Sequence, residues 1–133
     1  MFCFDTDTMS ATIRPRPPMS LVRALAALEE KEQVTTAVTV AELLLGVAGD
    51  ADETRRKRVR TLASWLPAMP FDRSAAEAYG PLRHELETSG RRLDERDLMI
   101  ASICLARDLT LVTGNVRHFE RVPGLRVENW LEG

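Results

Sequence analysis

The chain has 133 residues, 44% hydrophobic and 29% charged. This balance suits one folded domain and excludes collagen-like and low-complexity chains. The formal net charge of −2, from 18 basic and 20 acidic residues, excludes a globally basic nucleic-acid binder. All but two of the basic residues are arginine, whose guanidinium fork suits phosphate and carboxylate groups.

Several absences bear on location and chemistry. No apolar run approaches the roughly 20 residues that span a bilayer. Residues 1–5 lack the basic start and long apolar stretch of a signal peptide. We therefore expect no membrane contact and a cytoplasmic location. Cys3 and Cys104 lie in apolar segments without metal-ligand spacing, so we expect buried thiols.

The first half of the chain alternates apolar runs with helical patterns. Its predicted elements are a strand at 2–4, a polar turn at 5–8, an amphipathic helix at 21–28, a β-branched strand at 34–38, a helix at 39–47 and a helix at about 52–65. A capping box, Thr39-x-x-Glu42, is expected to begin the helix at 39–47. That helix has almost no polar side and is expected to be buried.

The second half continues the alternation. Its predicted elements are a weak strand at 66–71, a helix at 74–90, a helix at 94–108, a strand at 109–113, a helical turn at 115–119 and a strand at 126–130. Ser74-x-x-Glu77 is read as a capping box, and Pro81 should kink the helix that follows. Strands alternating with helices predict an α/β fold with a parallel sheet covered on both faces.

Four polar side chains fall at one edge of this predicted sheet. Asp5 and Asn115 follow strands, while Glu42 and Asp97 lie in the first turns of helices. Each alone is explained by a turn or a helix cap. Strand C-termini and helix N-termini of a parallel sheet share the ligand-binding edge, however. Three converging carboxylates need shared protons or a divalent cation, and oxygen ligands select Mg²⁺ or Mn²⁺. Asp72 ends the weak strand and either joins this group or caps a helix.

The sequence also resembles the PIN-domain ribonucleases of the VapC toxin type. The matching blocks, in order, are Phe4–Asp7, Thr39–Gly46, Ala78–Arg83, Asp97–Ser102, Leu111–Phe119 and Pro123–Trp130. The resemblance implies a single PIN domain over residues 1–133. It also implies a three-layer α/β/α sandwich with a short, mainly parallel sheet of four or five strands.

The same resemblance implies a Mg²⁺-dependent endoribonuclease toxin. Asp5, Glu42 and Asp97 match the acidic triad of the family, and Asn115 falls where many members carry a fourth acid or an asparagine. By this resemblance Asp5 and Asp97 bind Mg²⁺, with Mn²⁺ as a substitute, and a metal-activated water hydrolyses the RNA phosphodiester bond. Because Asn115 carries no charge, a second metal ion is left open.

The resemblance extends to supporting residues and partners. Thr6 and Thr113 fall at the polar positions that support the acids, and Asp7 adds an acid where asparagine or serine is more usual. A VapB-like antitoxin is the expected inhibitor. The chain is expected to form a homodimer and a toxin–antitoxin hetero-oligomer.

Arginines are the candidates for contact with the RNA backbone. Arg14 and Arg16 lie on a Pro-rich loop after the first acid, and Arg55, Arg56 and Arg58 belong to a run of five basic residues over positions 55–60. The alternative for this run is a solvated helix face. The apolar faces at 21–28 and 59–66 fit either core packing or docking of an antitoxin or second copy.

The sequence leaves two alternative functions. A haloacid-dehalogenase-like phosphatase would use Asp5 as its nucleophile, but it needs a well-placed lysine, and Lys31 and Lys57 are poorly placed. A non-catalytic PIN module that only binds partners is the second alternative. The intact set of Asp5, Glu42 and Asp97 argues against it.

Overall fold

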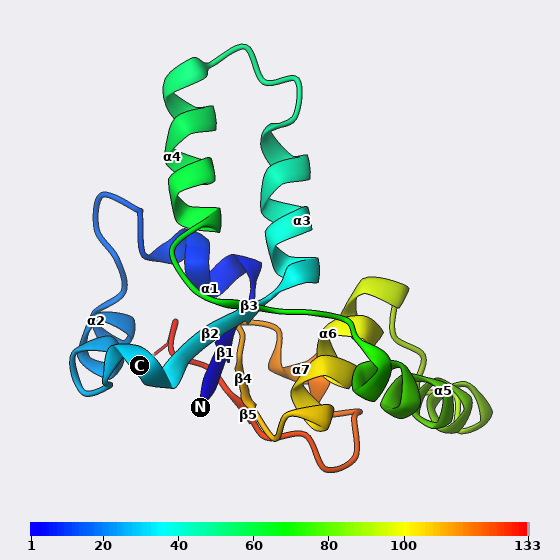
Figure 1. Cartoon of the computed structure of the whole chain (residues 1–133). Coiled ribbons are helices and arrows are strands. Elements are labelled where there is room, and N and C mark those ends of the chain that lie inside the picture. Colours follow the sequence, from blue (N-terminus) through cyan, green and yellow to red (C-terminus); the bar gives the residue numbers. More distant parts are fainter. Residues whose placement is uncertain (133) are drawn as a thin grey trace.

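The computed structural model describes residues 1–132, so Gly133, the last residue of the predicted domain, lies outside it. A five-stranded sheet is flanked by helices (Figure 1). The elements are β1 (Phe2–Phe4), α1 (Thr6–Ala11), α2 (Met19–Ala26), a 3₁₀ turn (Glu30–Glu32), β2 (Gln33–Thr36), α3 (Ala37–Val47), α4 (Glu53–Ala63), β3 (Ala68–Met69), α5 (Arg73–Thr88), α6 (Glu95–Ala106), β4 (Thr110–Val112), α7 (Val116–Phe119) and β5 (Val127–Glu128).

All strands of the sheet are parallel. Their order is β3-β2-β1-β4-β5, which places β1 at the centre between β2 and β4. Cys3 of β1 pairs with Val34 on one side and Leu111 on the other. The predicted parallel α/β sheet is confirmed.

Two apolar clusters lie on the two faces of the sheet. Successive residues of a strand point to opposite faces, so Cys3 packs with α5, α6 and α7, whereas Phe4 packs with α1, α2 and the inner ends of α3 and α4. The predicted three-layer α/β/α arrangement is confirmed. Cys3 and Cys104 are free, fully buried thiols, as expected. Hydrogen bonding with Cys104 and burial raise the pKa of the Cys3 thiol.

Helices α3 and α4 form a hairpin that projects from the body of the molecule (Figure 1). Because the hairpin projects, α3 exposes part of its apolar surface: the exposed fractions are 66% for Leu45 and 41% for Leu44. The prediction that this helix is buried is therefore wrong. Only the side that faces α4 and the sheet, with Leu43 and Val47, is buried.

The predicted polar turn at 5–8 is wrong, because residues 6–11 form the short helix α1. The Asp5 carboxylate accepts a hydrogen bond from the Thr8 backbone N–H at 2.9 Å, which caps this helix. The Thr8 hydroxyl donates to the Val112 carbonyl oxygen at 3.0 Å, and Met9 is fully buried. Tertiary contacts of this kind stabilise a helix too short to be stable alone.

Helix α3 begins earlier than predicted. Thr36, not Thr39, is its N-cap, since the Thr36 hydroxyl oxygen accepts from the Thr39 N–H at 3.0 Å. Strand β2 accordingly ends at Thr36 instead of Val38. The β-branched residues Val38 and Val40 resemble a strand but continue as helix because the cap precedes them.

The caps of α5 and α6 give one correction and one confirmation. Asp72, not Ser74, caps α5, and its carboxylate accepts from the Ala75 N–H at 3.1 Å. Asp94 caps α6 as predicted, accepting from the Asp97 N–H at 2.8 Å.

The remaining differences concern lengths. The strands predicted at 66–71 and 126–130 shorten to two residues each. Pro67 and Pro70 flank β3, and proline lacks the N–H that a longer strand would use. Pro81 lies within α5, which continues on both sides of it. Among the helices of residues 1–132, none is both long and apolar enough to cross a membrane.

Candidate active site

The four predicted acid and amide side chains lie around one cavity at the edge of the sheet where β1 and β4 end. This acid cavity has a volume of about 200 Å³. Its lining residues come from α1, α3, α6 and α7 and the loops before them: Asp5, Thr6, Asp7, Glu42, Asp97, Ile100, Asn115 and Phe119. The prediction that these four side chains lie at one edge of the sheet is confirmed.

Asp5 is the most buried acid of the cavity, with an exposed fraction of 8%. Burial raises the pKa of its carboxyl group. Hydrogen bonds from Thr113 and Thr8 act in the opposite direction by favouring the charged form, and the charge of Asp7 adds to the upward shift. Thr113 is fully buried and contacts Asp5 from the end of β4.

Glu42 lies on α3, across the cavity from Asp5. The Thr6 hydroxyl donates to Glu42 Oε1 at 3.4 Å, and the guanidinium Nη1 of Arg96 lies 3.9 Å from Glu42 Oε2. Burial raises the pKa of Glu42, and the negative charges of Asp94 and Asp5 add to this, whereas Arg96 opposes it. The carboxylate is thus held between a hydroxyl group and a cation.

Asp97 lies in the first turn of α6 and has the largest shift of the group. Burial and the negative charge of Asp94 raise its pKa to about 6, with Glu42 as a smaller cause. His118 opposes the shift, and its Nδ1 lies 3.7 Å from Asp97 Oδ2.

Asn115 precedes α7, but its side chain does not cap that helix, so the prediction that Asn115 is a helix cap is wrong. Its Nδ2 instead forms a hydrogen bond with His118 Nδ1 at 2.8 Å. Its backbone N–H donates to the Thr113 hydroxyl oxygen at 2.9 Å. These two bonds fix the Asn115 amide at the rim of the acid cavity.

The donor set fits a hard divalent cation. Burial and mutual repulsion raise the pKa values of three carboxyl groups around one cavity, and a bound cation relieves that repulsion. Within residues 1–132, no three His, Cys, Asp or Glu side chains are already arranged to hold an ion. Mg²⁺ is commonly bound by one or two carboxylates, with water in its other positions.

The predicted RNA-binding arginines do not line the acid cavity. Arg14, Arg55 and Arg58 instead line a separate cavity of about 310 Å³ between α4 and the loop after α1. Arg58 Nη2 donates to the Ile13 carbonyl oxygen at 2.7 Å, and Arg55 pairs with Asp50 at 3.0 Å.

The other two predicted arginines differ from each other. The Arg56 guanidinium donates to the backbone carbonyl oxygen of Asp50, within the α3–α4 hairpin. Arg16 is exposed on the loop between α1 and α2.

Sequence reasoning missed Arg96 and the positional role of His118. Arg96 occupies the first turn of α6, where the helix dipole favours acids, and a cation at that end is a signal that it has another partner. His118 is three residues after Asn115, a spacing at which helical side chains meet.

The lysines give no support to the phosphatase alternative. Lys31 pairs with Glu29 at 3.2 Å and Lys57 with Glu53 at 3.5 Å, and all four side chains are mostly exposed. Neither lysine lines the acid cavity.

The parallel sheet thus carries a carboxylate-lined cavity at the ends of β1 and β4. The PIN domain family model matches residues 2–125. A similar relative is the tRNA(fMet)-specific endonuclease VapC of Salmonella typhimurium, 34% identical over 130 residues that cover 97% of each chain. Ribonuclease VapC2 of Rickettsia felis is 32% identical and covers 98% of each chain.

Solved structures agree with these relatives. VapBC2 from Rickettsia felis, bound to a DNA fragment from its promoter, superposes with a TM-score of 0.83 at 32% identity, covering 97% of this chain and 98% of that one. FitAcB from Neisseria gonorrhoeae superposes with a TM-score of 0.85 at 27% identity, covering 98% of both chains. The chain belongs to the PIN-domain family and, within it, to the VapC-type ribonuclease toxins. Ribonucleases of this family act with a divalent metal ion.

Proposed function

We propose that residues 1–133 form a single PIN domain that hydrolyses RNA phosphodiester bonds at the acid cavity with Mg²⁺, for which Mn²⁺ can substitute. The observation that carries the proposal is the meeting of Asp5, Glu42, Asp97 and Asn115 around one cavity. Asp5 and Asp97 are the proposed direct ligands of the metal. A divalent ion at such a site supplies positive charge that polarises water and offsets charge on phosphate oxygens.

The protein groups have separate proposed roles. Glu42, held by the Thr6 hydroxyl, orients the attacking water, whose oxygen bonds to phosphorus as the ester oxygen leaves. Asn115, fixed by His118, positions a water or a phosphate oxygen with its amide. Thr113 supports the Asp5 carboxylate by a hydrogen bond, and Asp7 adds negative charge at the rim.

The test is the Asp5→Asn variant, incubated with total cellular RNA in Mg²⁺ or in chelator, with the cut ends mapped by sequencing. We expect the unmodified chain to cleave RNA in Mg²⁺. The cleavage rate of Asp5→Asn should be at least about 100-fold lower, which is the effect of removing one catalytic group. Asp108→Asn is the control, because Asp108 is remote from the cavity and its φ of 54° is tolerated by asparagine. Full Mg²⁺-dependent activity in Asp5→Asn would contradict the proposal, and inactivity of the unmodified chain would favour a non-catalytic module.

The comparisons suggest a first substrate and a first partner. The Salmonella relative is named for tRNA(fMet), so we propose that initiator tRNA is the first purified RNA to test. Neighbouring structures are VapBC complexes, so we propose a VapB-like antitoxin as inhibitor, together with a homodimer of this chain within a toxin–antitoxin hetero-oligomer. Action on tRNA implies a cytoplasmic location. Light scattering of the chain alone and with its antitoxin measures both assemblies.

The basic residues have a proposed role in substrate binding. Arg14, Arg55 and Arg58 line one cavity. Arg16 lies on the same loop as Arg14, and Arg56 lies on the same helix as the other two. This grouping supports contact of the five arginines with RNA phosphates away from the scissile bond.

A further inference from the structure

A second cavity adjoins the acid cavity and shares Glu42 with it. This apolar cavity, of about 360 Å³, lies between α3, the segment before α5, and α6. Its walls include the apolar side chains of Val38, Leu45, Phe71 and Met99, and its charged lining residues are Glu42 and Arg96. The volume lies at the lower end of the range of small-molecule sites, roughly 300–1,000 Å³.

We propose that this cavity binds one nucleobase of the RNA, next to the scissile phosphate, with Arg96 on the adjoining phosphate. The inference rests on the proposed cleavage at the acid cavity and adds the substrate subsite beside it. The occupant meets an apolar wall on one side, and Arg96 and the acid cavity beyond Glu42 on the other. A nucleotide has an apolar base face and an anionic phosphate in that arrangement.

Phe71 provides the aromatic surface. Its ring packs edge to face against Tyr79, with 5.7 Å between ring centres and an angle of 89°. This contact fixes the ring that lines the cavity. Stacking of a base on an aromatic side chain accepts any base, because every base has a π face.

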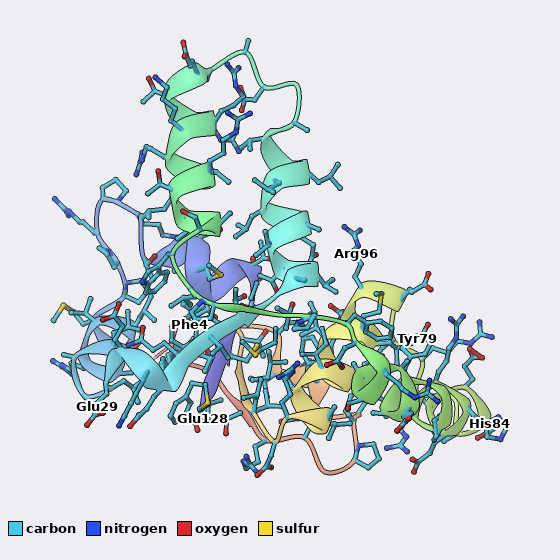
Figure 2. The ribbon with its side chains drawn as sticks, viewed as in Figure 1. Phe4, Glu29, Tyr79, His84, Arg96 and Glu128 are labelled. Atoms are coloured by element: carbon cyan, nitrogen blue, oxygen red, sulfur yellow. The ribbon has the colours of Figure 1, made fainter. Side chains whose placement is uncertain are left out.

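Arg96 provides the cation. Figure 2 shows its side chain extending outward from the beginning of α6, on the side of α3. It is 58% exposed and its nearest acid, Glu42, is 3.9 Å away, the limit of an ion pair. Such a weak, exposed pair is worth little, so the guanidinium is free to exchange this contact for a bidentate contact with phosphate.

The experiment uses the mapped cleavage site. Oligoribonucleotides of about ten residues around the cut are made with an abasic residue at each position in turn, and kcat/KM is measured in Mg²⁺ for each. We expect removal of the base on one side of the cut to lower kcat/KM about tenfold, the scale of one lost stacking contact. Ala41→Trp fills the cavity from the exposed surface of α3, and Phe71→Leu removes the aromatic face. Both should make cleavage indifferent to that base.

Arg96→Gln should lower kcat/KM and reduce the slope of its logarithm against log salt by about one, the effect of one phosphate contact. Arg23→Gln is the matched control: it removes the same charge from exposed α2, which packs on the other face of the sheet. Melting curves of all variants separate misfolding from loss of the subsite, and Ala41→Trp covers the case in which Phe71→Leu is unstable.

Several outcomes would overturn the subsite. One is cleavage of abasic and complete RNAs at equal rates by the unmodified chain. Another is an unchanged base dependence in Ala41→Trp combined with loss of the homodimer or of the antitoxin complex, which would assign the cavity to a protein partner. Absence of RNA cleavage by the unmodified chain contradicts the proposed function itself and is thereby distinguished from failure of the subsite.

Discussion

Burial and the neighbouring charge of Asp94 raise the pKa of Asp97 to about 6, because both disfavour its carboxylate. An acid whose pKa is higher in the folded than in the unfolded state binds more protons when folded. Its contribution to stability is therefore lost as pH rises from about 4, its unfolded value, through about 6. At neutral pH the metal-free site destabilises the fold.

The first prediction concerns the destabilising charge of Asp97 at neutral pH. Asp97→Asn should raise the free energy of unfolding of the metal-free protein at pH 7.5, because an amide occupies the same space without charge. After allowance for partial exposure to solvent, we expect a gain on the order of 1 kcal/mol, a rise of a few degrees in the melting temperature. Thermal melts in chelator measure it.

The control is again Asp108→Asn, which removes only an exposed ion pair with Arg126; such a pair contributes little, so this variant should not raise the melting temperature. The gain in Asp97→Asn should shrink at pH 4.5, where the native carboxyl group is already protonated. If Asp97→Asn is less stable than the unmodified chain at pH 7.5 in chelator, the charge of Asp97 does not destabilise the metal-free fold.

At the scale of elements, the beginning of α3 decides where Glu42 lies. Thr36 and Thr39 are both fully buried, and the Thr36 hydroxyl oxygen is 2.9 Å from that of Thr39 and 3.0 Å from its N–H. The cap therefore satisfies a helix N–H that has no water nearby.

The second prediction compares the two threonines. Thr36→Val keeps the shape but leaves the Thr39 N–H without its partner, and should cost about 1–2 kcal/mol of unfolding free energy. Thr39→Val keeps the cap and should cost less. Urea denaturation of both variants measures the difference, with exposed Thr61→Val as a control. The opposite order would mean that Thr39 begins the helix, as the sequence pattern predicted.

The order of elements could be predicted because strands and helices alternate with clear turns between them. The residue at which helix α3 begins could not be predicted. Thr36 and Thr39 are equally good caps by type, and the β-branched Val38 suits the end of a strand as well as the start of a helix. Helix α1 was missed because its polar residues at 6–8 read as a turn, while its stability depends on the distant Val112 carbonyl group.

The acids of the site were predictable because topology puts strand ends and helix starts at one edge, and because the family resemblance selected the same residues. The residues that surround these acids could not be predicted. Arg96 reaches Glu42 only because α6 packs against α3, a contact that no local pattern encodes. The exposure of Leu45 likewise depends on how far the α3–α4 hairpin projects.

At the scale of the whole molecule, the net charge of −2 hides a separation of charge. Acids line the cavity at the end of the sheet, whereas arginines gather between α4 and the loop after α1. A bound divalent ion offsets part of the negative charge of the acid cavity and offers phosphate oxygens a local cation. The near-neutral total therefore does not argue against an RNA substrate.

The third prediction tests the arginine surface. Arg14→Gln combined with Arg58→Gln should weaken binding of all RNAs by a similar factor and reduce the slope of log affinity against log salt by about one to two. Filter binding in Ca²⁺ over a range of KCl concentrations measures it. Arg23→Gln combined with Lys31→Gln removes the same charge from another surface. An unchanged slope in the arginine variant would assign these residues to a solvated helix face.

The central place of β1 has a consequence for synthesis in the cell. The first strand made pairs with β4, which contains residues 110–112, and Asp5 and Asp97 meet only once that strand is in place. A nascent chain emerges from the ribosome over several seconds, and for most of that time it carries Asp5 without the strand that completes the acid cavity. We therefore expect the chain to cleave RNA only near the end of its own translation, which leaves time for an inhibitor to be present before the site is complete.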